Sequence, residues 1–151
     1  MTEAEKQSRR QAWMGVLARS TSDDVAALLG SLGKTPLYEL IKRPETGTIM
    51  VEARAGGAGR RFNAGEATMT RCVIRLADGT MGFSYALGRD RKKAENAAVL
   101  DAVLQLEDEK NSSLLQGLDR LTQQHQAARD LKSRKAAATK VNFFTLVRGD
   151  G

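Results

Sequence analysis

Residues 67–87 contain the pattern that most restricts the fold of this chain. Ala67–Leu76 and Thr80–Leu87 are both predicted as strands, and Asp78-Gly79 lies between them. Asp-Gly between two such segments is the strongest short-range signal for a β-hairpin. An antiparallel sheet is therefore predicted in the middle of the chain.

Two further strands are predicted before this hairpin. Leu37–Arg43 is the first, and Thr48–Ala55 is the second because its apolar and polar side chains alternate. The segment Pro44-Glu45-Thr46-Gly47 between them is predicted as a turn. The sheet within residues 37–87 is thus expected to have four antiparallel strands.

The last predicted strand has one face of large side chains and one of small ones. The large set is Met81, Phe83, Tyr85 and Leu87, and the small set is Gly82, Ser84 and Ala86. Because side chains alternate between the two faces of a strand, each set shares one face. We expect the large set to lie in the core and the small set to allow another element to approach closely.

Helical spacing of apolar residues predicts helices on both sides of the sheet. Two helices are expected within residues 3–33 and two within residues 91–138. The last of these loses its apolar stripe beyond Leu121, so we expect that another chain covers it. The chain is accordingly predicted as one α+β domain of residues 1–151, in which N-terminal and C-terminal helices flank a four-stranded antiparallel sheet.

The composition excludes several classes of site. With one cysteine and one histidine, the chain has no internal disulfide and no His/Cys metal site of its own. A Ser–His or Cys–His nucleophile is nearly excluded for the same reason, so no catalytic residue is predicted. No segment approaches the roughly 18 apolar residues of a membrane span, and the polar N-terminus does not resemble a signal peptide. A cytoplasmic location is expected.

The charge balance favours an anionic partner. Lys and Arg number 24 against 18 Asp and Glu, which gives a formal charge of +6. Three places carry candidate anion-binding residues: a glycine-arginine segment, a strand face and a predicted helix start. The candidates are Gly56, Gly57, Gly59, Arg60, Arg61, Arg71, Arg89 and Arg91.

Each place also has a structural interpretation. The glycines could converge their amides on an anion, but a strand follows them, so a loop between strands is favoured. Arg71 and Arg75 share a strand face that could clamp a phosphate or could simply be solvated beside acids such as Glu52. Arg89 and Arg91 flank Asp90, a predicted helix N-cap, where cations oppose the helix dipole, which slightly favours a functional surface over a solvated one.

Several blocks of the sequence, in order along the chain, resemble the PhnG family. The blocks are Trp13–Ala18, Gly56–Arg71, Leu76–Tyr85, Leu87–Asp90, Ala94-Glu95 and Val141–Asp150. Arg60 departs from the family pattern, which has an acid there, and the helical region 105–135 matches only in character. The resemblance spans nearly the whole chain.

The resemblance implies an accessory subunit of the bacterial carbon–phosphorus lyase core complex, with PhnH-, PhnI- and PhnJ-type partners. In that complex an alkylphosphonate displaces adenine from MgATP and gives ribose 1-alkylphosphonate 5-triphosphate. Later steps remove pyrophosphate and cleave the carbon–phosphorus bond by radical chemistry. The chain itself is expected to bind no cofactor, and MgATP is expected as a substrate of the complex.

The residues leave one alternative from another class, a stand-alone basic module that binds anions or nucleic acid. No RNP, zinc-finger or helix-turn-helix signature supports nucleic-acid binding, and no nucleic-acid partner is expected.

The C-terminal segment 141–151 is predicted to be extended and to anchor on a partner subunit. It is apolar on both sides, so an extended chain would point Phe143 and Phe144 in opposite directions. A single sheet face could not bury both rings. We therefore predict that Phe143 and Phe144 dock between this domain and a partner, with Arg148 at the rim.

Overall fold

The computed structural model describes residues 2–54, 59–106 and 111–149, with the side chains of 53, 54 and 138–149 left out. The chain divides into two compact units, Met1–Leu118 and Asp119–Gly151. The helices and strands are, in order, α1 (Glu3–Arg19), α2 (Ser22–Gly30), β1 (Tyr38–Arg54), β2 (Arg61–Leu76), β3 (Met81–Leu87), α3 (Arg91–Gln105) and α4 (Ser112–Gly149). The predicted α+β class is confirmed.

The sheet is antiparallel in the order β1-β2-β3, and it has three strands rather than the four predicted. Leu37–Arg43 and Thr48–Ala55 were expected as separate strands, but β1 runs through both regions. The pairing of β1 with β2 shifts between Leu40 and Lys42 and again between Lys42 and Glu45. These bulges leave Pro44, which has no N–H to donate, outside the ladder, so the strand continues past it.

Capping side chains define where the first helices begin. Thr2 and Glu5 form a reciprocal capping box at the start of α1. Thr21 caps α2 by accepting from the backbone N–H of Asp24. Asp90 caps α3 as predicted, because its side chain accepts from the backbone N–H of Lys93 at 3.0 Å.

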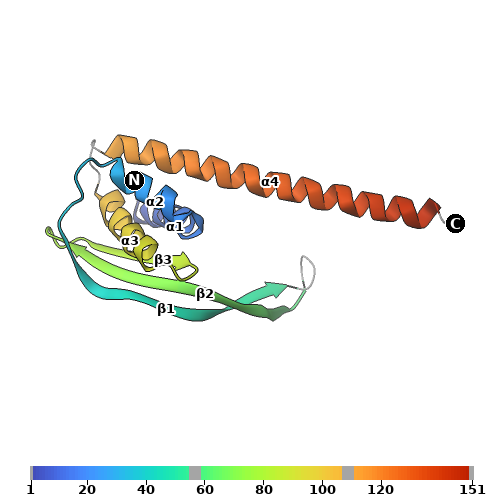
Figure 1. Cartoon of the computed structure of the whole chain (residues 1–151), viewed down its shortest axis with the longest axis horizontal. Helices are drawn as coiled ribbons and strands as arrows, with labels where there is room; N and C mark the ends of the chain where they lie inside the picture. The colour runs from blue at the N-terminus through green and yellow to red at the C-terminus, as the bar shows by residue number, and fades with distance from the viewer. Residues whose placement is uncertain (1, 55–58, 107–110, 150–151) are drawn as a thin grey trace. The chain divides into compact units, whose positions relative to one another are not determined.

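The core lies between the sheet and helices α1 to α3, which Figure 1 shows on one face of the sheet. Four alternate residues of β2 point into this core: Thr70, Cys72, Ile74 and Leu76. Thr70 also donates to the carbonyl of Gly88 at 2.8 Å, beside the start of α3. Alternation therefore places the odd-numbered residues of β2, from Met69 to Arg75, on the opposite face.

On β3 the buried face is the one that carries the small side chains Gly82, Ser84 and Ala86. This agrees with the prediction that another element approaches closely there. A Cβ atom added to Gly82 would lie 2.1 Å from the carbonyl oxygen of Ala98, so only glycine lets α3 pack here. Ser84 donates its hydroxyl to the carbonyl of Ala94 at 2.6 Å. The expectation that Phe83 and its large neighbours form the core is wrong, because α3 covers the small face instead and Phe83 remains 41% exposed.

The last helix, α4, is 38 residues long and includes residues that were expected to be extended. Residues 141–149 are helical, so the predicted extended segment is wrong over that range. No glycine or proline interrupts the sequence between residues 118 and 148. A helix satisfies its backbone groups internally, whereas an extended segment needs a neighbouring strand.

Burial fades along α4 as the sequence predicted. Leu114, Leu118 and Leu121 are buried, whereas Leu131 is 50% exposed. In the part of the chain that is described, no helix has the length and apolar character needed to cross a membrane.

Candidate functional site

A buried carboxylate, that of Asp101 in α3, fixes the edge of the sheet to two helices. Arg10 of α1 donates to it through Nε at 3.1 Å and Nη2 at 2.8 Å. The Trp13 indole donates at 2.8 Å, the backbone N–H of Phe83 at 2.9 Å and Gln105 at 3.3 Å. These bonds satisfy a buried charge and fix the position of Phe83.

Sequence reasoning did not single out Asp101. The available signal was an acid in the middle of the apolar helical stripe that contains Ala97, Leu100 and Leu104. An acid on a core-facing stripe needs donors, and the Arg10 and Trp13 side chains, three residues apart on α1, supply them from one face. The pKa of Arg10 is raised, chiefly by its hydrogen bond to Asp101.

At the start of α3, the structure separates a buried cation from exposed ones. Arg89 and Arg91 are exposed on either side of Asp90. Lys93 is only 7% exposed and donates through Nζ to the carbonyl of Ala18 at 3.0 Å, at the end of α1. Burial lowers the pKa of Lys93. Lys93 thus caps a helix C-terminus, while Arg89 and Arg91 remain available at the surface.

The side of the sheet away from the helices is the candidate interaction surface. We call it the open face and define it by the side chains that β2 and β3 present there: Met69, Arg71, Val73, Arg75, Met81, Phe83, Tyr85 and Leu87. Phe83 is 41% exposed and Leu87 is 44% exposed. The Arg10 guanidinium lies 5.4 Å from the centre of the Phe83 ring, within cation–π range.

Ion pairs neutralise most of the charge on this side of β1 and β2. Arg75 pairs with Glu39 across the strands, and Lys42 pairs with Glu45 at 3.4 Å. Glu52, a predicted neighbour of Arg71 and Arg75, instead lies 3.8 Å from Arg61. Among the described residues, Arg71 is the charged side chain of the open face that has no ion pair.

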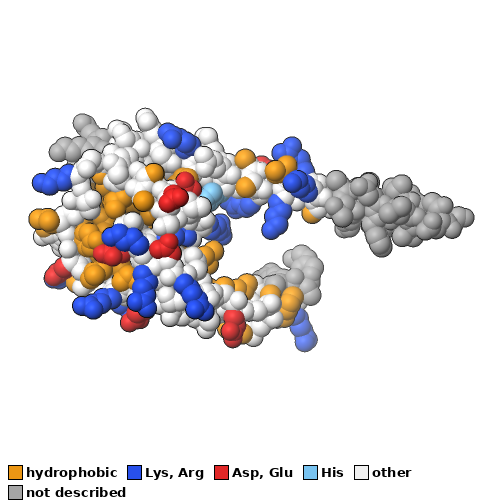
Figure 2. Space-filling model, viewed as in Figure 1, with side chains coloured by type: hydrophobic (Ala, Val, Ile, Leu, Met, Phe, Trp, Pro, Cys, Tyr) orange, Lys and Arg blue, Asp and Glu red, His pale blue; other side chains and the backbone are white. Residues whose placement is uncertain are grey.

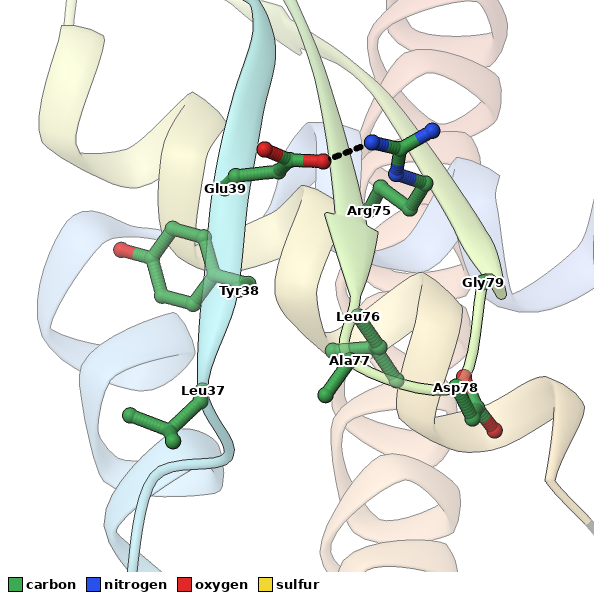
Figure 3. Close-up of a pocket in the computed structure, with 8 residues that line it drawn as sticks. All are labelled: Leu37, Tyr38, Glu39, Arg75, Leu76, Ala77, Asp78 and Gly79. Carbon is green, nitrogen blue, oxygen red and sulfur yellow. Dashed lines mark hydrogen bonds and ion pairs between the residues drawn. The ribbon is translucent and has the colours of Figure 1, made fainter.

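Two hollows flank the open face. The first, of about 470 Å³, lies at the end of the sheet beside the β2–β3 turn (Figure 3). Arg75 and Glu39 face each other there, and Asp78 accepts from the backbone N–H of Thr80 at 2.9 Å. The second hollow, of about 210 Å³, is lined by Lys42, Glu45, Thr46, Gly47, Thr48, Ile49, Met69 and Arg71.

Tyr38 is not available as an acid or base in the first hollow. Its hydroxyl donates to Glu95 of α3 at 2.6 Å. Burial, reinforced by Glu95, raises the pKa of Tyr38 to about 12. This tyrosine therefore links the sheet to the helix layer.

The predicted anion-binding residues occupy separate parts of the molecule. Gly56 and Gly57 lie outside the described residues, and Gly59, Arg60 and Arg61 lie where the chain enters β2. Arg71 lies in the middle of β2, whereas Arg89 and Arg91 lie at the start of α3. Figure 2 shows basic, acidic and apolar side chains mixed along the β1–β2 hairpin in this view. The role of these residues in anion binding remains a prediction.

The predicted partner-interface residues Phe143, Phe144 and Arg148 lie in α4. Their side chains are outside the described ones, so their role stays a prediction. The argument that an extended segment points the two rings in opposite directions no longer applies, because the backbone there is helical.

Comparison with known proteins gives a consistent result over nearly the whole chain. The family model described as phosphonate metabolism protein PhnG matches residues 8–149. A relative from Rhizobium meliloti (strain 1021), named alpha-D-ribose 1-methylphosphonate 5-triphosphate synthase subunit PhnG, is 35% identical over 147 residues. The alignment covers 95% of this chain and 91% of that relative.

Proposed function

The chain belongs to the PhnG family of phosphonate metabolism proteins, and we propose that it is an accessory subunit of the carbon–phosphorus lyase core complex. In this proposal it supports a PhnI-type subunit that joins an alkylphosphonate, such as methylphosphonate, to the ribose of MgATP. An oxygen of the phosphonate forms the new bond to the ribose carbon as the bond to adenine breaks. The products are ribose 1-alkylphosphonate 5-triphosphate and adenine.

The observation that carries this proposal is a match to a subunit of that synthase over nearly the whole length of both chains. The 35% identity extends over 95% of this chain, so the similarity is not confined to one motif. The relative is named as a subunit of a synthase, which supports a role within a multi-protein enzyme. The chain is therefore assigned to the enzyme as one component of it.

An accessory role is supported by the way the interior uses its titratable groups. The Asp101 carboxylate is saturated by donors from α1, β3 and α3, and Lys93 is bound to a helix carbonyl. Burial raises the pKa of the Cys72 thiol to about 11, which keeps it protonated at neutral pH. These groups hold the fold together, and we assign the displacement of adenine to the partner.

The partners proposed are the PhnH-, PhnI- and PhnJ-type subunits, in a hetero-oligomer. MgATP and the phosphonate are substrates of the complex in this proposal, and this chain binds no cofactor of its own. The uncovered apolar side chains of the open face and of α4 support a need for protein partners. Because ATP is a substrate, we place the complex in the cytoplasm.

A genetic and biochemical test addresses the proposal directly. A bacterium from which this gene is deleted should fail to grow on methylphosphonate as its sole phosphorus source while growing normally on phosphate. The gene supplied in trans should restore growth, and the tagged chain should co-purify with the three partner subunits. Normal growth of the deletion strain on methylphosphonate, or purification of the chain without those subunits, would refute the assignment.

A further inference from the structure

We propose that the open face is the docking surface for an amphipathic helix of a partner subunit, and that this helix places a carboxylate against Arg71. The inference rests on the proposed function, because it takes the chain to be a subunit. It goes further by naming the surface and the chemistry of the element that binds there. Three observations carry it: exposed apolar side chains, one cation without an ion pair and an adjacent hollow.

The first observation is that the described helices of the unit Met1–Leu118 cover one face of the sheet. Helices α1 to α3 bury Cys72, Ile74 and Ala86 on the inner face. On the other face Phe83 and Leu87 are more than two-fifths exposed, while Met69, Val73 and Tyr85 are half-buried. Exposed apolar side chains that gather on one face are typical of an interaction site. Because antiparallel sheets often leave one polar face to water, it is the apolar character of this face that points to a partner.

The second observation concerns charge. Glu39 and Glu45, which lie opposite Arg75 and Arg71 on β1, are already in ion pairs with Arg75 and Lys42. Arg71 lies between them, opposite Glu45 on β1 and Tyr85 on β3, with no ion pair among the described residues. Covering Arg71 with a purely apolar surface would be unfavourable, because a buried charge needs a partner. An element that brings an acid is therefore favoured there.

The third observation is the hollow of about 210 Å³ beside Arg71. Gly47 pairs with Met69 across the strands, and the missing side chain at Gly47 opens this space. A Cβ atom built on Gly47 would meet nothing within 4 Å. An aspartate or glutamate from a docked helix could enter here and reach the Arg71 guanidinium in a bidentate contact.

The same charge argument disfavours a second copy of this chain as the occupant. In a two-fold pairing the open face would meet itself, because such interfaces use the same patch on both subunits. The acids it could offer are held by Arg75 and Lys42. Arg71 would then face no available carboxylate, so a partner of different sequence is favoured.

The test uses the full chain co-expressed with its three partner subunits. Gly47→Val fills the hollow without strain, Arg71→Glu reverses the charge and Arg71→Met removes it while keeping apolar bulk. Lys34→Glu serves as the matched control, because Lys34 is exposed between α2 and β1 and is not one of the residues that define the open face. We expect Gly47→Val and Arg71→Glu to weaken assembly by about tenfold or more relative to the control. We also expect Arg71→Met to reduce the salt dependence of assembly.

The outcomes separate the inference from the proposed function. Circular dichroism of each variant first establishes that it folds like the unmodified chain. If folded Gly47→Val and Arg71→Glu assemble as well as Lys34→Glu, the open face is not the docking surface, although the subunit assignment stands. If the unmodified chain does not assemble, both proposals fail. Loss of self-association with unchanged assembly would identify a second copy as the occupant and overturn the inference.

Discussion

Asp101 holds three elements together through one carboxylate, and this explains why a charge is tolerated in the core. Its side chain is 0% exposed, whereas the Arg10 side chain that pairs with it is 31% exposed. Removing the charge of Asp101 leaves donors from Arg10, Trp13 and Phe83 facing a weaker acceptor in a buried place. Removing Arg10 leaves a carboxylate that still has three other donors.

We expect Asp101→Asn to lower the free energy of unfolding by about 2 kcal/mol or more, and more than Arg10→Gln does. Urea denaturation of both variants measures this difference. A double-mutant cycle on the pair should show that their effects are not additive. Equal and small losses of unfolding free energy in both variants would mean that the Asp101 carboxylate does not hold α1 and β3 to α3.

Alanine substitutions at Gly82 and Gly15 test the packing, because they are expected to change stability in opposite directions. Gly82→Ala places a methyl group against the carbonyl of Ala98, so we expect about 1–3 kcal/mol of destabilisation from overpacking. Gly15→Ala meets nothing within 4 Å and lies inside α1, so we expect about 0.5–1 kcal/mol of stabilisation. Thermal and urea unfolding of the two variants should move in opposite directions, and a stabilising Gly82→Ala would contradict the packing described.

Cys72 provides a pH-dependent test of burial. Burial raises the pKa of its thiol to about 11, so the folded protein keeps the thiol protonated between pH 8 and 9, where the unfolded chain begins to form thiolate. We expect alkylation by iodoacetamide at pH 9 to be more than about tenfold slower in the folded protein than in guanidinium chloride. Since the chain has one cysteine, mass spectrometry reads this site alone. Equal alkylation rates in the folded and unfolded protein would show that the helices do not cover the face of β2 that carries Cys72.

The residue pattern predicted some of these positions and missed others for physical reasons. Gly82, Ser84 and Ala86 share a small face by simple alternation, and this predicted the close approach of a helix. The same alternation gave a wrong prediction for Phe83. We expected the large side chains of β3 to be buried, but α3 packs against the small side chains on the other face. The roles of Lys93 and Asp101 depend on α1, which is distant in sequence, so local patterns could not reveal them.

Among the secondary-structure elements, β1 and α4 differ most from expectation. Pro44 and Gly47 were read as a turn, but β1 lies at an edge of the sheet, where bulges absorb a proline. In α4, the apolar C-terminal residues suggested an extended segment, but residues 141–149 are helical, and a helix satisfies its backbone groups internally. The helices α1, α2 and α3 lie within the predicted ranges 3–33 and 91–138 because their apolar spacing was clear, and the cap of α3 by Asp90 is confirmed.

The end of α4 allows a direct test of the anchor prediction. The compact unit Met1–Leu118 contains the sheet and helices α1 to α3. A chain that ends at Lys140 should therefore change its free energy of unfolding by less than about 1 kcal/mol, yet lose assembly with the partner subunits. Circular dichroism and co-purification measure the two effects, with removal of Asp150 and Gly151 alone as the control. Unfolding of the shortened chain, or assembly at full affinity, would rule out the anchor.

At the scale of the whole molecule, the chain forms one compact unit, Met1–Leu118, whose open face carries exposed apolar side chains, and a second unit, Asp119–Gly151, which continues α4. Buried polar groups such as Asp101, Ser84 and Lys93 bind helices to the sheet or to one another. The surface of the chain leaves apolar side chains such as Phe83, Leu87 and Leu131 exposed. These features, together with the match to a synthase subunit over 95% of this chain, favour a role within a complex of several protein chains.

The most direct measurement of this account is adenine release from MgATP and methylphosphonate, followed by chromatography. The purified chain alone should release no adenine, and the partner subunits without it should show a rate reduced by at least about tenfold. Adding the chain back should restore the rate and saturate at a fixed ratio of subunits. Adenine release by the purified chain alone, abolished by a substitution within it, would contradict the accessory role, and so would a full rate from the partners without it.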